Sequence, residues 1–309
     1  MSEIWTMGEI LVEVMRPKCD MPLYKTAEFL GPYPSGAPAI FIDTVARLGH
    51  EAAIIGGIGD DDFGKCIMDR LNNNGVNCDN VIKGSGSTAV AFVTYSQDGS
   101  RKFIFHIENT PAVMADGNSA NDDKAKFFHV MGCSLMSGNR LCEAINRTAS
   151  RFYDTGAKIS FDPNIRPELL GDRNIMYIVG PIIERTSVLL PGVDELKLIT
   201  GTDSIDSAIS KAFMHRNLEL IVLKQGKKGC EVFSKDGRHL KAAAYKVEEV
   251  DPTGAGDCFD AGFLCGLLEG LSLECCAKKA AAAGALNAAA FGPMEGEISP
   301  QNVKTMIGL

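Results

Sequence analysis

Two hydrophobic patterns alternate along this chain. One consists of short apolar runs rich in Val, Ile and Phe, which are typical of buried strands. These runs are Ile10–Val14, Ala52–Ile58, Ala89–Tyr95, Phe103–Ile107, Phe127–Met131, Lys158–Phe161, Ser187–Leu190 and Leu220–Leu223. The other pattern places apolar residues three and four positions apart, which predicts helices with one buried face. These segments are Ile40–Leu48, Phe63–Asn73, Arg140–Tyr153, Ile175–Glu184 and Ile205–His215.

From Phe127 onward the two patterns alternate regularly. Such an alternation predicts parallel strands in one sheet, with helices covering both of its faces. The stretch 280-AAAAGALNAAA-290 predicts a further packed helix, because alanine has the highest helix propensity. The sequence contains no internal repeat and no linker. We therefore expect a single three-layer α/β domain over residues 1–309, with a mostly parallel central sheet.

Four segments in the first third of the chain differ from this scheme. Thr88–Tyr95 and Arg101–His106 alternate apolar with polar residues and are joined by 97-QDG-99, which predicts a hairpin. Ile10–Val14 and Tyr24–Phe29 have a similar pattern. Together they predict a small sheet with one solvated face that projects from the main domain.

A projecting sheet of this kind is a natural lid over a site that must exclude water. Its strands would lie within about residues 10–34 and 87–108, with 31-GPYPSGAP-38 as the hinge. Because such a sheet exposes an apolar face and unpaired edges, we also expect it to be the contact of a homodimer.

Composition narrows the classes of function. The net charge of −8 and the pI near 5.2 argue against a nucleic-acid or membrane-surface role, since both favour a basic face. The ten cysteines include no C-x-x-C pair, which indicates free thiols in a reducing compartment. The chain starts without the basic and apolar regions of a signal peptide, and no apolar run reaches the roughly 18–20 residues that span a bilayer. We expect a cytoplasmic protein.

The stretch 251-DPTGAGDCF-259 carries the most specific chemistry. Pro252 fixes a turn, while Gly254 and Gly256 permit close approach of the backbone to a ligand. The apolar run Phe259–Leu268 predicts a helix whose first N–H groups carry roughly half a positive charge. An acidic protein can bind phosphate with these groups. A carboxylate at Asp257 would then be useful as a proton acceptor, the alternative being that it only stabilises the helix N-terminus.

This stretch resembles the C-terminal signature of the ribokinase-like (PfkB) carbohydrate kinases. The resemblance implies that Asp257 is the catalytic base and that the amides of Gly254, Ala255 and Gly256 form the anion hole. Residues 35–64 resemble the N-terminal signature of the same family, which implies that Gly36 and Ala37 contact the sugar. In that segment Ile40 stands where the family usually has Asn.

A competing motif is excluded by charge. The segment 59-GDDDFGKC-66 nearly fits a P-loop, but Cys66 cannot offer a hydroxyl to Mg²⁺. Three aspartates would also occupy the place intended for phosphate. The segment fits the turn G-x-D-x-F-G of the carbohydrate kinases instead.

Two further segments concern the acceptor and the transferred group. The stretch 161-FDPNIRPELL-170 follows a strand and resembles the branch of 2-keto-3-deoxygluconate kinases, fructokinases and tagatose kinases. It implies that Asn164 contacts the substrate and that Arg166 binds the transferring phosphoryl group, with a surface ion pair as the alternative for Arg166. Glu13 matches an acid that binds sugar hydroxyls in relatives, and the alternative is an exposed glutamate on a lid strand.

The resemblance also implies nucleotide and metal ligands. In 221-IVLKQGKKGCEVFS-234, Lys224, Gly226 and Gly229 match the segment that holds nucleotide phosphates and ribose, and Asn287 matches the adenine pocket. Glu195 matches the residue that acts on Mg²⁺ through water, although Gly192 replaces the Asn of that motif. Asp251 and Thr253 match a backbone site that binds K⁺ in a few relatives.

These matches imply a ribokinase-like fold and an ATP-dependent phosphotransferase with an alcohol acceptor (EC 2.7.1.-). It would transfer the γ-phosphate of ATP, with Mg²⁺ and in some relatives K⁺, to a primary hydroxyl of a ketohexose, 2-keto-3-deoxygluconate or ribose. One alternative is a nucleoside or sugar-phosphate acceptor, but a phosphorylated acceptor needs cations near the lid, where Lys25, Arg101 and Lys102 are the candidates. The other is an inactive sugar-binding regulator.

Overall fold

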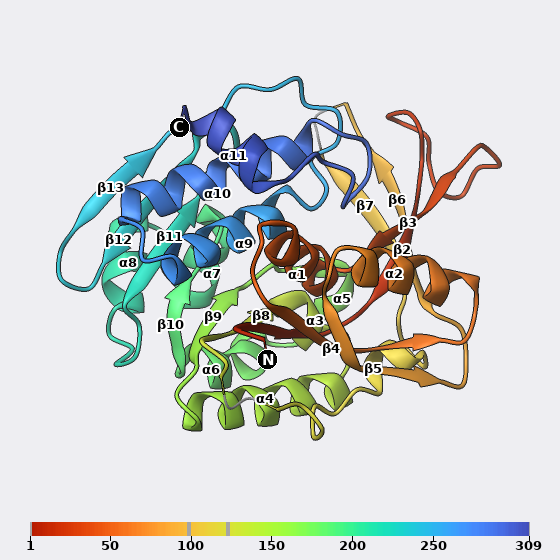
Figure 1. Cartoon of the computed structure of the whole chain (residues 1–309), viewed down its shortest axis with the longest axis horizontal. Helices are drawn as coiled ribbons and strands as arrows, with labels where there is room; N and C mark the ends of the chain where they lie inside the picture. Colours follow the sequence, from red (N-terminus) through yellow and green to blue (C-terminus); the bar gives the residue numbers. More distant parts are fainter. Residues whose placement is uncertain (1, 98–99, 122–123, 309) are drawn as a thin grey trace.

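The main body is built on one large sheet (Figure 1). The computed structural model describes residues 2–97, 100–121 and 124–308. Within these residues the sheet has nine strands in the order β13-β12-β11-β10-β9-β8-β1-β4-β5. They are β1 (Ile4–Met7), β4 (Ala52–Gly59), β5 (Asn77–Gly84), β8 (Phe127–Met131), β9 (Lys158–Asp162), β10 (Thr186–Leu189), β11 (Leu220–Lys224), β12 (Cys230–Ser234) and β13 (His239–Ala242). Only β11–β12 and β12–β13 pair antiparallel, so the prediction of a mostly parallel sheet is confirmed.

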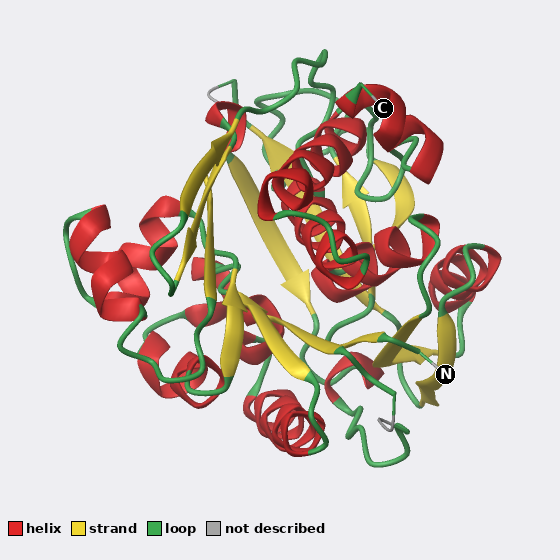
Figure 2. Ribbon diagram, turned by 60° about the vertical axis from the view of Figure 1, so that its left-hand side comes forward, coloured by secondary structure: helices red, strands yellow, loops and turns green. Residues whose placement is uncertain are grey.

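Helices cover both faces of this sheet (Figure 2). Successive strand residues point to opposite faces, so Ile4 belongs to one core layer and Trp5 to the other. The first layer contains α1 (Ala37–Arg47), α2 (Asp62–Asn73), α9 (Ala255–Leu268), α10 (Leu273–Ala288) and α11 (Pro300–Ile307). The second contains α3 (Gly132–Met136), α4 (Asn139–Asp154), α6 (Ile175–Ile183), α7 (Val193–Thr200) and α8 (Ile205–Ala212). The three-layer α/β/α prediction is confirmed.

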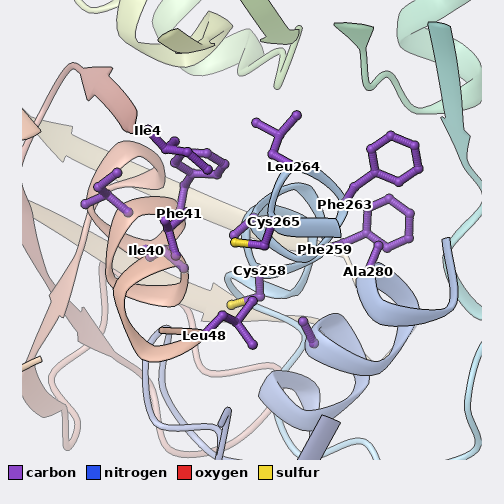
Figure 3. Packing of buried hydrophobic residues seen from close by; sticks show 14 of the residues in the cluster. Ile4, Ile40, Phe41, Leu48, Cys258, Phe259, Phe263, Leu264, Cys265 and Ala280 are labelled. Carbon is purple, nitrogen blue, oxygen red and sulfur yellow. The ribbon is translucent and has the colours of Figure 1, made fainter. Parts of the chain in front are cut away.

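The helix that follows the signature turn is held by close packing. Figure 3 shows α9 between α1 and α10, with Cys258 and Cys265 near Ile40 and Leu48. At Gly262 a Cβ atom would lie 2.9 Å from the backbone of Ala280, so the two helices approach more closely than side chains would allow. The Ala-rich segment is α10, and its alanines are largely buried, as the sequence predicted.

A second, smaller sheet projects from the body (Figure 1). Its strand order is β3-β2-β6-β7, with parallel pairing only between β2 and β6. The strands are β2 (Leu11–Met15), β3 (Leu30–Ser35), β6 (Ala89–Tyr95) and β7 (Arg101–His106). We call it the small sheet. Along β7, Arg101, Phe103 and Phe105 are half-buried while the residues between them are exposed, so one face is turned toward the body.

The structure corrects the prediction for one strand and for the hinge. Tyr24–Phe29 is not a strand, and the segment predicted as hinge instead contains β3 and the start of α1. The reason is Arg16. Its fully buried guanidinium donates to backbone carbonyl oxygens that a neighbouring strand would need as acceptors. It donates to the carbonyl oxygens of Pro22, Lys25 and Glu28 at 3.0, 2.5 and 3.0 Å. The chain from residue 17 to 29 therefore wraps around one side chain.

Three further expectations concern the chain as a whole. The predicted turn 97-QDG-99 lies largely outside the described residues. All ten cysteines are free thiols, and half of them are buried. None of the helices in the described ranges combines the length and apolar character that a bilayer span requires.

One short helix, α5 (Pro167–Leu170), follows β9 and contacts β7 of the small sheet.

Candidate active site

The signature turn forms the start of α9 and leaves backbone amides free there. Gly254 is the N-cap of α9 and has φ of +79°, a conformation that favours glycine. The Ala255 amide donates to the Pro252 carbonyl at 3.3 Å and is therefore partly used. Among the described residues, no carbonyl accepts from the amides of Gly254, Gly256 or Asp257. Two of the three predicted amides, those of Gly254 and Gly256, are thus free, and Asp257 takes the place of Ala255 as the third.

Two distant segments fix this turn. Asp251 accepts from the amides of Thr253 at 2.9 Å and Gly292 at 3.0 Å. Asn287 on α10 donates to the Thr253 carbonyl at 2.8 Å. The free amides therefore have a fixed direction before any ligand arrives, which is the property that makes backbone dipoles effective in stabilising charge.

Asp257 lies in the wall of a cavity of about 160 Å³. The carboxylate is 7% exposed and accepts from Asn164 Nδ2 at 3.1 Å. Burial, together with the negative charge of Asp162, raises the pKa of Asp257 to about 7. Nearby Arg166, Lys224 and Arg101 oppose this shift. A carboxylate with a pKa near neutrality, facing a cavity next to free amides, is suited to accept a proton from a hydroxyl.

Three cationic side chains surround the same cavity, and they differ in whether a carboxylate neutralises their charge. Lys224 is half-buried and its Nζ lies 2.8 Å from Asp162 and 3.1 Å from Asp260. Within the described chain, neither Arg166 nor Arg101 forms an ion pair. The alternative of a surface ion pair for Arg166 is therefore not realised. Both guanidinium groups are available to an anion in the cavity.

The two aspartates at Lys224 also influence each other's ionisation. The Lys224 ammonium, working against burial, lowers the pKa of Asp162. Burial and the Asp162 charge raise the pKa of Asp260 well above its usual range. Since two aspartate side chains lie within 3.1 Å of its ammonium, the charge of Lys224 is largely neutralised by the protein itself.

The residues predicted for the acceptor lie between the small sheet and the body. Glu13 on β2 is buried, not exposed as its alternative required, and it accepts from Ser35 Oγ at 2.7 Å. Burial raises its pKa to about 7. Glu13 Oε2 and Asn164 Oδ1 are buried without a hydrogen-bond partner among the described residues, so a ligand hydroxyl could donate to each. Gly36 and Ala37 open α1, and a Cβ on Gly36 would lie 2.5 Å from the Glu9 carbonyl oxygen.

A second cavity of about 520 Å³ adjoins the first and fits a nucleoside. Gly226 and Gly229 line it together with Tyr245, Phe259 and the small residues of α10. Asn287 does not line this cavity, which corrects the expectation of an adenine contact. Asn287 is fully buried behind the wall of this cavity, and its side-chain amide donates to the Thr253 carbonyl of the signature turn.

The predicted metal ligands are occupied by protein donors. Glu195 lines the smaller cavity, and its two oxygens accept from the amides of Gly192 at 2.7 Å and Ile165 at 2.8 Å. Each oxygen keeps a further lone pair, so Glu195 fits contact with Mg²⁺ through water. Asp251 has both oxygens in hydrogen bonds, and Thr253 Oγ1 lies 3.0 Å from the Tyr95 hydroxyl. Only backbone carbonyls of that turn remain for K⁺.

Sequence reasoning missed three residues of this site, Asp162, Asp260 and Tyr95, and considered Arg101 only as a cation for a phosphorylated acceptor. Asp162 ends β9 and Asp260 lies one helical turn after Asp257, yet nothing in the sequence pairs either with Lys224. Tyr95 and Arg101 come from the small sheet and contact the signature turn. The only local signal was the half-buried alternation of β7, which places Arg101 on the inward face.

Comparison with known proteins agrees with this geometry. A model described as pfkB family carbohydrate kinase matches residues 12–300. A probable fructokinase-5 of Arabidopsis thaliana is 32% identical over 270 residues, covering 85% of this chain and 82% of the relative. Fructokinase-1 of Zea mays is 31% identical over 260 residues, covering 82% and 79%.

A solved structure is also similar over its full length. An E. coli protein with the provisional name Ribokinase II has a TM-score of 0.92 and 34% identity, and the comparison covers 100% of this chain and 99% of that one. The family match spans the signature turn, both cavities and most of the small sheet, and it shows that this chain belongs to the pfkB family of carbohydrate kinases.

Proposed function

We propose that this chain is an ATP-dependent kinase of a small, unphosphorylated sugar. The single observation that carries the proposal is Asp257, a buried carboxylate with a pKa near 7 that faces a cavity beside free helix-start amides. A binding protein has no use for such a base, whereas phosphoryl transfer to a hydroxyl requires one. This argues against an inactive regulator.

The two cavities suggest how the substrates are arranged. The adenosine of ATP fits the larger cavity, against Phe259 and the small residues of α10. The triphosphate then reaches the amides of Gly254 and Gly256, while the sugar occupies the space between Asp257, Asn164 and Glu13.

The reaction follows from these positions. Asp257 accepts the proton of a primary hydroxyl while that oxygen forms a bond to the γ-phosphorus and the bond from phosphorus to the leaving oxygen of ADP breaks. The amides and Arg166 stabilise the charge on the transferring group. When bound with ATP, Mg²⁺ screens the phosphate charges, and Glu195 would hold it through water.

The charge distribution favours an unphosphorylated acceptor. Of the three cations considered for a phosphorylated one, Lys25 and Lys102 are exposed, and among them only Arg101 faces the cavity. Glu13 and Asp257 would repel a second phosphate. A ketohexose, 2-keto-3-deoxygluconate or ribose offers hydroxyls for the unpartnered oxygens of Glu13 and Asn164.

The test is a coupled assay of ADP release over a panel of sugars, sugar phosphates and nucleosides. We expect turnover with at least one unphosphorylated sugar and little with its phosphate ester. Asp257→Asn should lower kcat by several orders of magnitude while the Kd of ATP changes little, because the amide keeps the bond from Asn164 but cannot accept a proton. ATP and sugar that stabilise the protein without ADP release would instead favour the regulator.

Two finer proposals accompany this function. The small sheet acts as the lid that keeps water away from the phosphoryl group, and its outward face is the contact of a homodimer. Both are supported by the inward turn of Arg101, Phe103 and Phe105 and by the partly exposed apolar residues on the opposite face.

A further inference from the structure

The loop end of the hairpin formed by β6 and β7 contacts the signature turn. Tyr95 and Arg101 are direct cross-strand partners at this end. The Tyr95 hydroxyl donates to Asp251 Oδ1 at 3.0 Å and lies 3.0 Å from Thr253 Oγ1. Arg101 Nη1 donates to the same Thr253 oxygen at 3.4 Å. This pair therefore attaches the small sheet to the turn that opens α9.

Arg101 also lies where the two cavities meet. Both cavities are lined by Arg101, Lys224, Pro252 and Gly256, and by no other residue in common. A phosphoryl group that moves from a nucleotide in the larger cavity to an acceptor in the smaller one must pass these four residues. Two of them are cationic, and one supplies a free backbone amide.

The two cations at this passage are not equivalent. Lys224 is held by Asp162 and Asp260, which neutralise it. Arg101 forms no ion pair with any carboxylate in the described part of the chain. Within the described residues its one side-chain hydrogen bond is the long one to Thr253, so most of its five N–H donors remain available. An unpaired, half-buried guanidinium next to free amides is a strong site for phosphoryl oxygens.

Resting on the proposed function, we propose that Arg101 is a further catalytic residue, which binds the transferring phosphoryl group from the small sheet. As the sugar oxygen bonds to phosphorus and the bond to ADP breaks, charge spreads over the three oxygens of that group. Arg166 binds it from the body and Arg101 from the small sheet. Phosphoryl transfer then requires the small sheet to be docked, because one of its guanidinium groups arrives only with that sheet.

The position of Arg101 distinguishes it from its neighbour in the sequence. Lys102 follows directly on β7 but is exposed on the other face of the small sheet. It lines neither cavity. Lys102→Ala is therefore a matched control that removes one positive charge from the same strand without touching the passage.

The experiment compares Arg101→Ala, Arg101→Lys and Lys102→Ala with the wild type. The readouts are kcat with the sugar found in the panel, and the Kd of ADP alone and of ADP with aluminium fluoride in the presence of that sugar. Bound with ADP, aluminium fluoride mimics the transferring phosphoryl group in the transition state. Arg101→Ala should lower kcat by roughly 100-fold or more, as loss of an arginine that stabilises phosphoryl transfer does.

The binding measurements locate that loss. In Arg101→Ala, the Kd of ADP should change by less than about threefold, whereas the ADP–aluminium fluoride complex should weaken by about the same factor as kcat falls. Arg101→Lys should recover little, since an ammonium cannot bind two oxygens in one plane. Free guanidinium in the assay should partly restore Arg101→Ala, and Lys102→Ala should match the wild type.

Two results would overturn the proposal. If Arg101→Ala keeps kcat within about threefold of the wild type, or raises only the KM of the sugar, Arg101 does not act on the phosphoryl group. If the affinities for ADP and for the fluoride complex fall equally and free guanidinium restores nothing, Arg101 only holds the small sheet in place. Absence of ADP release by the wild type would instead reject the proposed function itself.

Discussion

Asp257 shows how one residue meets two opposing requirements. As the proposed base it must be ionised to accept a proton, yet it lies in a cavity where burial makes ionisation costly. Burial and Asp162 shift its pKa upward, and the three cations around the cavity limit that shift. The outcome, a pKa of about 7, leaves a substantial fraction ionised at neutral pH and keeps the carboxylate basic.

This balance predicts the pH dependence of the reaction. Because the base acts in its ionised form, kcat/KM should rise with pH, by up to about tenfold per unit below pH 7, and level off above it. Initial rates from pH 5 to 9 at low sugar concentration measure this limb. An acid limb near pH 4, the range of an ordinary aspartate, would contradict the environment described for Asp257.

Glu13 has a raised pKa of about 7 as well and needs its own control. Glu13→Gln removes that titration while keeping a side-chain oxygen for Ser35 and the sugar. The acid limb should persist in Glu13→Gln, with a higher KM for the sugar. Its disappearance would assign the limb to Glu13.

The site residues that could be predicted are those that lie close together in the sequence. Gly254, Gly256 and Asp257 form one short stretch, and its chemistry follows from a helix start. Lys224 was predicted as a nucleotide ligand, but its neutralisation by Asp162 and Asp260 depends on three elements that meet only in the fold. Asn287 was placed in the wrong layer because a buried helix gives no signal of which side chain faces a cavity.

Among the elements, the helix pair α9 and α10 positions the signature turn. Gly262 and Gly266 on α9 face Ala280 and Cys276 on α10, and added Cβ atoms would lie about 3.0 Å or less from their Cα atoms. Gly284 brings α10 equally close to the Ala255 carbonyl at the start of α9. This contact, with Asn287 bound to Thr253, sets the direction of the free amides.

Gly262→Ala should therefore damage both stability and catalysis. Its Cβ would meet backbone that cannot move without shifting α9, so we expect a loss of about 1–3 kcal/mol in the free energy of unfolding. Urea unfolding measures this loss, and kcat should fall with it. Lys278→Ala on the exposed side of α10 is the control and should stay within about 0.5 kcal/mol. An unchanged Gly262→Ala would mean that the two helices can separate at little cost.

Most elements with a long hydrophobic run or period were predicted, whereas the short strands β1, β12 and β13, of four or five residues each, were missed. The parallel strands β8 to β11 and most helices were found, since both faces of each strand are buried. β5 was missed because it is a half-exposed edge strand with polar residues, and β3 because its prolines suggested a hinge. Prolines are tolerated there since β3 is at the edge of the small sheet.

For the molecule as a whole, the outward face of the small sheet is a surface of its own. Val14, Phe92 and Ile104 lie side by side on neighbouring strands, and Ile104 is 44% exposed. A row of this kind on an exposed sheet favours contact with an identical copy.

We expect the protein to be a dimer in solution and Ile104→Glu to be a monomer, because a buried carboxylate at the contact would lack a partner. Light scattering on eluted fractions at micromolar concentration measures the mass. Met214→Glu, at an exposed methionine beyond the end of α8, should remain dimeric. A monomeric wild type, or a dimeric Ile104→Glu, would place the contact elsewhere or remove it.

The attachment of the signature turn from several sides has a consequence for how this enzyme can diversify. Asp251, Asn287 and the glycine contacts of α9 belong to the body, whereas Glu13 and the inward residues of β7 belong to the small sheet. Apart from Arg101, the residues proposed for bond making therefore belong to the body, whereas Glu13 and the other inward residues of β7 face the acceptor from the small sheet. New substrate preferences can arise by exchanging side chains on β2 and β7 other than Arg101, with the residues of phosphoryl transfer kept.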